Sequence, residues 1–216
     1  SYASVTAYDA TGGEPMRMYD CTIRGDVPFV WSGNGFQGAD AELHRCDVAG
    51  GTDGLNFQNG NVKAISTWVH DLAWYAEDFT HVDGTHNDGL QIHGGRDYQV
   101  LGCRFDIGYK GTSAILSTTQ SGVGGTIGDV EISKSWFFST WPSQANACAI
   151  ALNIIDDGTG QTGWSVTDCV FSAPGTWRIN GPGSTRVGLC SAGTKALLTW
   201  TGNVDTNGVP VTLGTG

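Results

Sequence analysis

The sequence predicts an all-β chain that winds into a single parallel β-helix of about seven coils. Three observations support this prediction: one short phrase returns seven times, the composition favours tight turns, and almost no segment has the period of an amphipathic helix. The 216 residues include 33 glycines, which suits a chain that turns often. Repeats at intervals of roughly 20 to 50 residues are typical of solenoids, propellers and arrays.

The repeated phrase opens mostly with a small or polar residue, continues with cysteine or a substitute, and closes in most copies with Val, Ile or Phe. Its central positions are Cys21, Cys46, Thr67, Cys103, Ser135, Cys169 and Asn203, which lie 25, 21, 36, 32, 34 and 34 residues apart. The strands therefore keep one phase while the loops vary in length. We expect the four cysteines to stack inside the coil as free thiols, because parallel side chains on neighbouring strands make poor disulfide geometry.

A second column of strands follows the first within each coil. Its expected members are residues 28–31, 53–57, 88–92, 113–116, 149–152 and 177–179. Leu55 and Phe57 share one phase with Leu90 and Ile92, so these four face inward and the residues between them face outward. A third, shorter strand closes each coil into a triangle. We expect a single domain, 1–216, in which 1–14 form the N-terminal cap and 204–216 form a C-terminal cap that ends in one last strand.

The formal net charge is −10 and the sequence pI is near 4.6. Such a field repels nucleic acid and anionic membranes, so neither is an expected partner. No stretch approaches the ~20 apolar residues of a membrane-spanning helix. The charge favours a neutral ligand, or an anionic one bridged by cations.

The phrases Gly102-Cys103-Arg104-Phe105 and 86–93, together with the closing segment 202–211, resemble those of right-handed parallel β-helix proteins of the pectate-lyase-like superfamily. The nearest resemblance is to secreted bacterial β-helix proteins and to bacteriophage tail-spike or minor-tail proteins. It implies a right-handed coil, an extracellular or virion-surface location, a polysaccharide partner, and a monomer or homotrimer. It also implies binding and cleavage of the polysaccharide, by a lyase or a glycoside hydrolase, in a groove along the second strand column. The alternatives are a non-catalytic glycan-adhesion or structural module, such as a phage tail protein, and a scaffold for a missing partner domain.

Candidate catalytic residues come from the densest polar segment, 77–93, and from the coil before it. Asp53 and Asp88 hold equivalent strand positions, so we expect them about 5 Å apart. Carboxylates this close divide acid and base roles or share a cation such as Ca²⁺. His86 and His93 flank the same strand and are candidate proton acceptors. The alternatives are that the Asp-Gly pairs cap turns and that the histidines are surface residues bonded to nearby backbone.

Candidate substrate-binding residues form two groups. The first is the outward strip Asn56, Gln58 and Gln91, with Lys110 as the nearest lysine and Arg96 close in sequence. Lyase chemistry in this superfamily needs a base and a group that neutralises the substrate's carboxylate, usually Ca²⁺ or an Arg/Lys pair. The absence of an arginine-rich cluster counts against a simple pectate-lyase mechanism. The alternative interpretation of Lys110 is a solvated lysine in a loop.

The second group is the outward side of the first column, where Arg104 should lie between Trp68 and Trp136 as a cation–π sandwich. This wall suits sugar stacking, or coverage by a loop or a neighbouring subunit. We expect the pair His70-Asp71 to cap a corner. The next carboxylate pair along the chain is Asp156 and Asp157.

Overall fold

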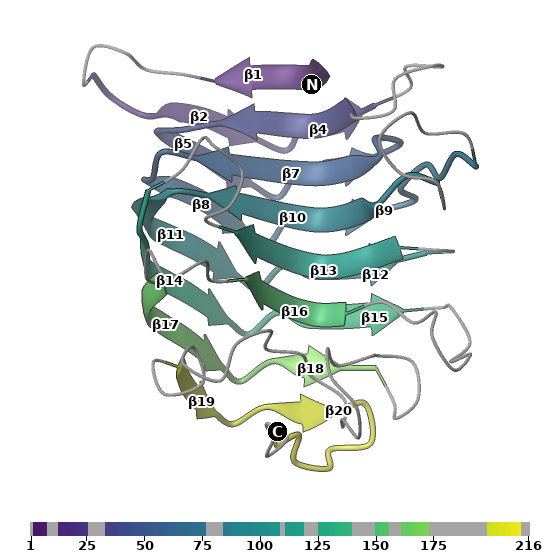
Figure 1. The fold of residues 1–216 in the computed structure, drawn as a ribbon, viewed down its shortest axis with the longest axis vertical. Helices are drawn as coiled ribbons and strands as arrows, with labels where there is room; N and C mark the ends of the chain where they lie inside the picture. The colour runs from purple at the N-terminus through teal and green to yellow at the C-terminus, as the bar shows by residue number, and fades with distance from the viewer. Residues whose placement is uncertain are drawn as a thin grey trace.

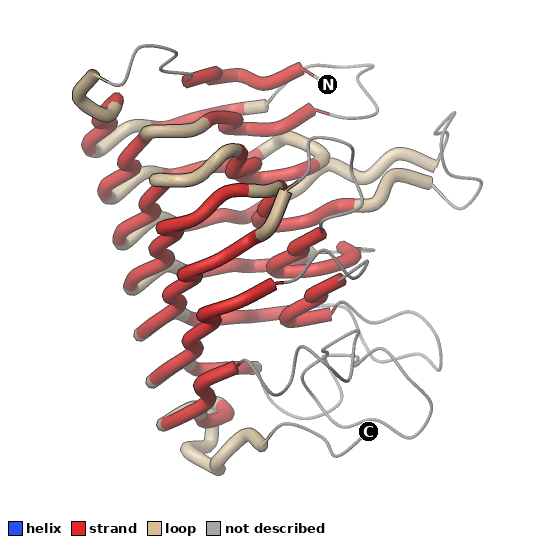
Figure 2. The backbone as a smooth tube through the Cα atoms, turned by 60° about the vertical axis from the view of Figure 1, so that its left-hand side comes forward, coloured by secondary structure: helices blue, strands red, loops and turns tan. Residues whose placement is uncertain are grey.

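A computed structural model describes residues 2–7, 13–25, 33–76, 84–108, 111–118, 125–139, 150–155, 161–172 and 198–212. These residues form a parallel β-helix (Figure 1), and three sheets of parallel strands make its three walls. The predicted fold class is confirmed. The described residues contain no helix (Figure 2), and hence none long and apolar enough to cross a bilayer.

The three walls are named here sheet A, sheet B and sheet C. Sheet A contains β1 (Tyr2–Ala7), β4 (Gly33–Gly38), β7 (Asp53–Gln58), β10 (Asn87–His93), β13 (Gly111–Thr118) and β16 (Ile150–Ile155). Sheet B contains β2 (Met16–Tyr19), β5 (Ala41–His44), β8 (Val62–Ile65), β11 (Gly95–Leu101), β14 (Ile127–Ser133), β17 (Gln161–Thr167) and β19 (Leu198–Thr201). Sheet C contains β3 (Thr22–Arg24), β6 (Asp47–Ala49), β9 (Trp68–His70), β12 (Arg104–Ile107), β15 (Trp136–Ser139), β18 (Val170–Phe171) and β20 (Val204–Asp205).

The chain visits the sheets in the order A, B, C and then begins the next coil. Sheets B and C each contain seven strands, which matches the predicted seven coils. In Figure 1 the strands of sheet A cross the front from right to left, the strands of sheet B run back behind them, and the chain descends. The coil is therefore right-handed, as expected for connections between parallel strands.

The repeated phrase marks the corner between sheet B and sheet C. Its first residue has a positive φ in all seven copies: Asp20, Arg45, Ser66, Gly102, Lys134, Asp168 and Gly202. These φ values lie between 51° and 71°, which is the left-handed region that sharp corners require. The repeat in the sequence is thus a repeat of backbone conformation.

The column of central residues lies inside the coil, as predicted. Cys46, Cys103 and Cys169 are buried free thiols, and Cys21, in the first coil, is partly buried. Burial raises the pKa of Cys103 to about 12, so this thiol stays protonated at neutral pH. The substitutes form bonds between coils: Ser135 Oγ accepts from the Cys103 amide at 3.1 Å. Cys148 and Cys190 lie outside the described residues.

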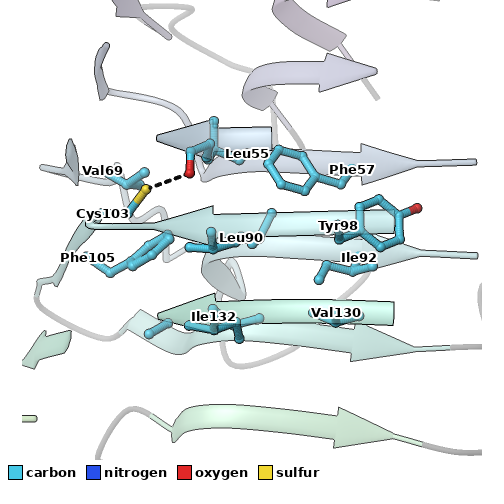
Figure 3. Packing of buried hydrophobic residues seen from close by; sticks show 14 of the residues in the cluster. Leu55, Phe57, Val69, Leu90, Ile92, Tyr98, Cys103, Phe105, Val130 and Ile132 are labelled. Carbon is cyan, nitrogen blue, oxygen red and sulfur yellow. Dashed lines mark hydrogen bonds between the residues drawn. The ribbon is translucent and has the colours of Figure 1, made fainter. Parts of the chain in front are cut away.

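The core consists of the inward-facing side chains of all three sheets (Figure 3). Leu55, Phe57, Leu90 and Ile92 are fully buried, which confirms their predicted inward phase. Rings stack from coil to coil behind sheet C, with centroids of Phe105 and Phe137 5.5 Å apart, of Phe137 and Phe171 5.0 Å apart, and of Phe171 and Trp200 5.6 Å apart. Phenylalanines therefore meet on the neighbouring strands β12, β15 and β18, and Trp200 of sheet B continues the stack.

One expectation about the strands was wrong. The third strand of each coil, in sheet B, is four to seven residues long, whereas the strands of sheet C have two to four. The second member of sheet A is Gly33–Gly38, a strand that the sequence analysis did not identify. The expected segments 28–31 and 177–179 lie outside the described residues. Glycine is needed in β4 because a Cβ on Gly35 would lie 2.6 Å from Val48 Cγ1.

The predicted last strand is also absent from the described end of the chain. After β20 the chain turns back, and Val204 forms an isolated antiparallel bridge with Pro210. Val211 is buried, its amide donates to Asn203 O at 2.9 Å, and its carbonyl accepts from Trp200 Nε1 at 2.7 Å. This turn covers the end of the core. At the other end, residues 2–7 of the expected cap form β1, the outermost strand of sheet A.

Candidate functional site

The outer face of sheet A carries the predicted carboxylate pair. A Cβ on Gly54 would lie 2.3 Å from Val69 Cγ1, and one on Gly89 would lie 2.9 Å from Phe105 Cδ1. Both glycines therefore face the core, as do Leu55 and Leu90 directly after them, so the usual alternation of a strand is interrupted at each Asp-Gly-Leu segment. Asp88 lies on the outer face with Gln91, to which it bonds. The Asp-Gly pairs lie within strands rather than in turns, so packing explains their glycines.

Asp53 and Asp88 are brought together, as predicted. Asp53 Oδ1 accepts from the backbone amide of Asp88 at 2.8 Å, and Asp88 Oδ2 accepts from Gln91 Nε2 at 3.0 Å. Asp88 Oδ1 is buried and has no donor at bonding geometry among the described residues. One carboxylate thus bonds the backbone of the next coil, as the capping interpretation expects, while the other keeps an oxygen that no described residue bonds.

Both carboxyl groups are deeply buried, and burial is the main reason that the pKa of each is raised. The charge of Asp88 raises the pKa of Asp53 further. Gln91, Ser113 and His86 lower the pKa of Asp88 but do not cancel the effect of burial. The pair therefore retains a proton to higher pH than a free aspartate does, and the two groups titrate together. Neither is open to solvent, although a catalytic pair must reach its substrate.

The amide strip lies on the same outer face as Asp88, and its members bond one another. Asn56 Nδ2 donates to Gln91 Oε1 at 3.3 Å, and Gln58 Nε2 donates to Asn56 Oδ1 at 3.1 Å. His93 Nε2 lies 3.2 Å from Gln91 Oε1, and burial lowers the pKa of His93. Asn56 and Gln58 are buried. The strip is a continuous polar network rather than a row of groups that face solvent.

Among the remaining predicted groups near sheet A, His86 lies close enough to Asp88 to lower the pKa of that carboxyl. His86 is exposed before the start of β10, and Arg96 belongs to sheet B, where its Nε donates to Asp129 Oδ2 at 2.9 Å. Lys110, Asp156 and Asp157 lie outside the described residues.

The predicted Ca²⁺ ligands do not form a calcium site within the described residues. Ca²⁺ takes six to eight oxygen ligands, but Asp53 Oδ1 and Asp88 Oδ2 already accept hydrogen bonds. No group of three or more His, Cys, Asp or Glu side chains is arranged to hold a metal in the described part of the chain. The raised pKa values of the pair also disfavour the doubly ionised form that a cation needs.

Sheet C presents the second predicted group on an open face. Its outward column aligns Trp68, Arg104 and Trp136 on three neighbouring strands, as predicted. Trp68 is 40% exposed and Trp136 is 48% exposed. The described residues therefore leave both indoles open.

The predicted cation–π sandwich forms with one different partner. The Arg104 guanidinium carbon lies 5.6 Å from the centroid of Trp68 and 4.8 Å from that of Phe138. Phe138 replaces Trp136 because side chains lean along the strand as well as away from it. The Trp136 ring packs beside Phe138 instead, with centroids 5.9 Å apart.

A groove of about 410 Å³ follows this wall, and we call it the sheet C groove. Its lining residues are Trp68, His70, Asp71, Arg104, Asp106, Gly108, Phe138 and Ser139. Asp106 Oδ2 accepts from Trp68 Nε1 at 2.8 Å and from Arg104 Nε at 2.9 Å. This one carboxylate therefore fixes the orientation of both the indole and the guanidinium.

The side chain of His70 supports Trp68 at the edge of the groove. Its ring stacks on Trp68, with centroids 3.7 Å apart. Its Nδ1 lies 2.8 Å from Asp71 Oδ2 and its Nε2 lies 2.7 Å from Asp47 Oδ1. A neutral imidazole donates one hydrogen bond and an imidazolium donates two, so at least one of these carboxylates is bonded in either state. The structural role expected for His70-Asp71 thus includes support of an exposed tryptophan.

Sequence reasoning missed Asp106 and Phe138. Each follows an identified residue by two positions, Arg104 and Trp136 respectively, so the two-residue period of a strand would have placed both on the same face. The signal was present in the sequence. A second, larger depression of about 550 Å³ lies over sheet B, among charged residues that include Lys63, Asp97, Asp129 and Glu131.

Comparisons with protein-family models, with curated proteins and with solved structures found no significant match to this chain. Function must therefore be inferred from the geometry of the described residues.

Proposed function

We propose that this protein binds carbohydrate through the sheet C groove. The observation that carries the proposal is the pair of exposed indoles, Trp68 and Trp136, on one wall with the polar groups of Asp106, Asp71 and Arg104 beside them. Aromatic faces pack against the apolar faces of sugar rings, and fixed polar groups bond the hydroxyls at the ring edge. Binding sites of this type combine apolar contact area with a few well-placed polar groups.

The arrangement of the groove favours a ligand that needs little rearrangement of the protein. Asp106 already holds Trp68 and Arg104 in place, and His70 supports the indole from below. Preorganised side chains lose little conformational entropy when a ligand binds. The net charge of −10 favours neutral sugars over polyanionic ones.

The proposal places the chain among glycan-binding β-helices, close to the pectate-lyase-like superfamily that the sequence resembles. It favours the adhesion alternative, with an extracellular or virion-surface location, over cleavage as the main activity. Three features weigh against cleavage as the leading proposal: the predicted carboxylates are buried, the amide strip bonds to itself, and the described residues form no calcium site.

A panel of neutral and acidic polysaccharides tests the proposal, with binding measured by affinity electrophoresis or calorimetry. We expect at least one neutral polysaccharide to bind, and Trp68→Ala to weaken that binding by about tenfold or more, which corresponds to about 1.4 kcal/mol. Tyr19→Ala is the matched control, because Tyr19 is an exposed aromatic residue of sheet B outside the groove. Circular dichroism and thermal unfolding establish that both variants are folded.

Absence of binding across the panel would contradict the proposal, as would equal effects of the two variants. A homotrimer that buries the indoles would also contradict it. In that case light scattering would give a trimer mass, and Trp68→Ala would change the mass instead of the affinity.

Cleavage by the sheet A carboxyl pair is the second candidate function. It is favoured by the raised pKa values of Asp53 and Asp88 and by Asp88 Oδ1, which no described residue bonds. Reducing ends without unsaturated products would indicate a hydrolase, and both together would indicate a lyase. Asp88→Asn should then abolish product formation while Trp68→Ala weakens binding. A polysaccharide that binds without either product would exclude this second function for that ligand.

A further inference from the structure

The sheet C groove has a spacing along the solenoid axis that limits the shape of its ligand. Arg104 pairs with Trp68 on one side and with Trp136 on the other, so the two tryptophans lie two strands apart in one column. Neighbouring strands are about 4.8 Å apart, which separates the two Cα positions by roughly 9.5 Å along the axis. The coil itself sets this distance, because both residues belong to paired strands.

The two indoles also have similar surroundings. Each leans along its strand onto the ring two residues later, Trp68 onto His70 at 3.7 Å and Trp136 beside Phe138 at 5.9 Å. Arg104 lies between the two positions, held by Asp106. The wall therefore presents an aromatic group, a polar group and an aromatic group on three successive coils.

We infer that the sheet C groove, together with Trp136 beside its lining residue Phe138, takes a neutral glycan in an extended, ribbon-like conformation, laid parallel to the solenoid axis across β9, β12 and β15. In a chain of equatorially linked β-1,4 sugars, alternate rings face the same way and recur at close to the distance between the two tryptophans. The rings beside Trp68 and Trp136 then pack against the exposed part of each indole, and the ring between them faces Arg104 and Asp106. A helical glycan such as an α-1,4-linked glucan curves away from a flat wall and reaches only one indole. This inference rests on the proposed function.

Oligosaccharides matched in composition but not in linkage test the inference by calorimetry. The β-1,4 series comprises oligomers of glucose, N-acetylglucosamine, xylose and mannose, and the matched α-1,4 series is that of glucose. We expect at least one β-1,4 series to bind, with an affinity that rises from disaccharide to tetrasaccharide and then levels off. The α-1,4 series should bind about tenfold more weakly or not at all.

Trp136→Ala sharpens the test because it removes only the far platform. It should weaken binding of the tetrasaccharide about tenfold and leave binding of the disaccharide nearly unchanged, whereas Trp68→Ala should weaken both. Its 48% exposure makes Trp136 a suitable position for replacement without loss of the fold, which circular dichroism checks.

The failures of the two proposals are distinguishable. If the α-1,4 series binds as tightly as every β-1,4 series, or if Trp136→Ala affects disaccharide and tetrasaccharide equally, the axial placement is wrong while carbohydrate binding stands. Binding of some polysaccharide in the wider panel but of no β-1,4 oligomer has the same meaning. If neither the oligomers nor the polysaccharides bind, the proposed function itself fails.

Discussion

The outer faces of sheet A and sheet C are made by the same coils, yet one is closed and the other is open. On sheet A the outward residues are amides and carboxyls that bond one another, and Asp53, Asp88, Asn56 and Gln58 are buried. On sheet C the outward residues include two tryptophans that are at least 40% exposed beside a groove of about 410 Å³. A polar composition alone therefore does not identify a binding face.

The two faces differ because their outward side chains differ in how far they can form hydrogen bonds with one another. Short amide and carboxyl side chains on neighbouring strands lie close enough to bond directly, so a row of them forms a network with few free donors or acceptors. Large aromatic side chains have few polar atoms with which to bond one another, so part of their apolar surface stays exposed and available to a partner. The face that looks chemically richer in sequence is thus the less available one.

The largest difference in stability between the two faces should come from replacing one glycine beside each face with alanine. Gly54→Ala in sheet A places a Cβ 2.3 Å from Val69 Cγ1 and 2.5 Å from Gly89 O, and overpacking of this kind costs about 1–3 kcal/mol. Gly108→Ala beside the sheet C groove meets nothing within 4 Å and should change the free energy of unfolding by less than about 0.5 kcal/mol. Urea unfolding measures both variants. Equal losses would mean that sheet A is not packed as tightly as its glycines indicate.

A smaller, pH-dependent effect should come from the closed face. Because burial raises the pKa of Asp53 in the folded state, the folded protein holds a proton that the unfolded chain releases above about pH 4. The contribution of Asp53 to the free energy of unfolding should therefore be greatest below that pH and fall as the pH rises through the raised pKa. Asp53→Asn keeps an oxygen for the Asp88 amide and removes the titration, so its stability relative to the natural protein should increase with pH. Each unit of raised pKa corresponds to about 1.4 kcal/mol.

Urea unfolding at several pH values between 4 and 8 measures this difference. Parallel stability curves for Asp53→Asn and the natural protein would show that the carboxyl of Asp53 ionises as easily in the folded protein as in the unfolded chain. The conclusion that the outer face of sheet A is closed to solvent would then be wrong.

The smallest effect should come from Arg104 on the open face. The side chain of Arg104 is 49% exposed, so loss of its contacts with Trp68 and Phe138 in Arg104→Ala should cost only about 0.5 kcal/mol, the value for exposed cation–π pairs. Thermal or urea unfolding of the variant measures it. A loss near 2 kcal/mol, the desolvated value, would indicate that a partner covers the wall in solution.

Much of the fold was predictable because it depends on residues that recur. The column from Cys21 to Asn203 needs a small inward side chain in every coil and a left-handed residue before it, so each coil repeats the signal. The strand at Gly33–Gly38 was not identified, and the turn after Val204 was expected to be a strand. The turn lies at an end of the solenoid, where β20 has one neighbouring strand instead of two. The strand β4 pairs with both β1 and β7, but its glycine-rich sequence lacks an alternating apolar pattern.

The sequence alone therefore determined the coil, the inward column and the alignment of Trp68, Arg104 and Trp136, because strand period and register follow from local residue order. Tertiary structure decided which outward residues remain available. Contacts between coils buried Asp53 and Asp88, joined the amides into a network, and directed Arg104 onto Phe138 instead of Trp136. Burial and the direction in which a side chain leans depend on neighbours that are 20 to 40 residues away in the chain, and no local pattern contains that information.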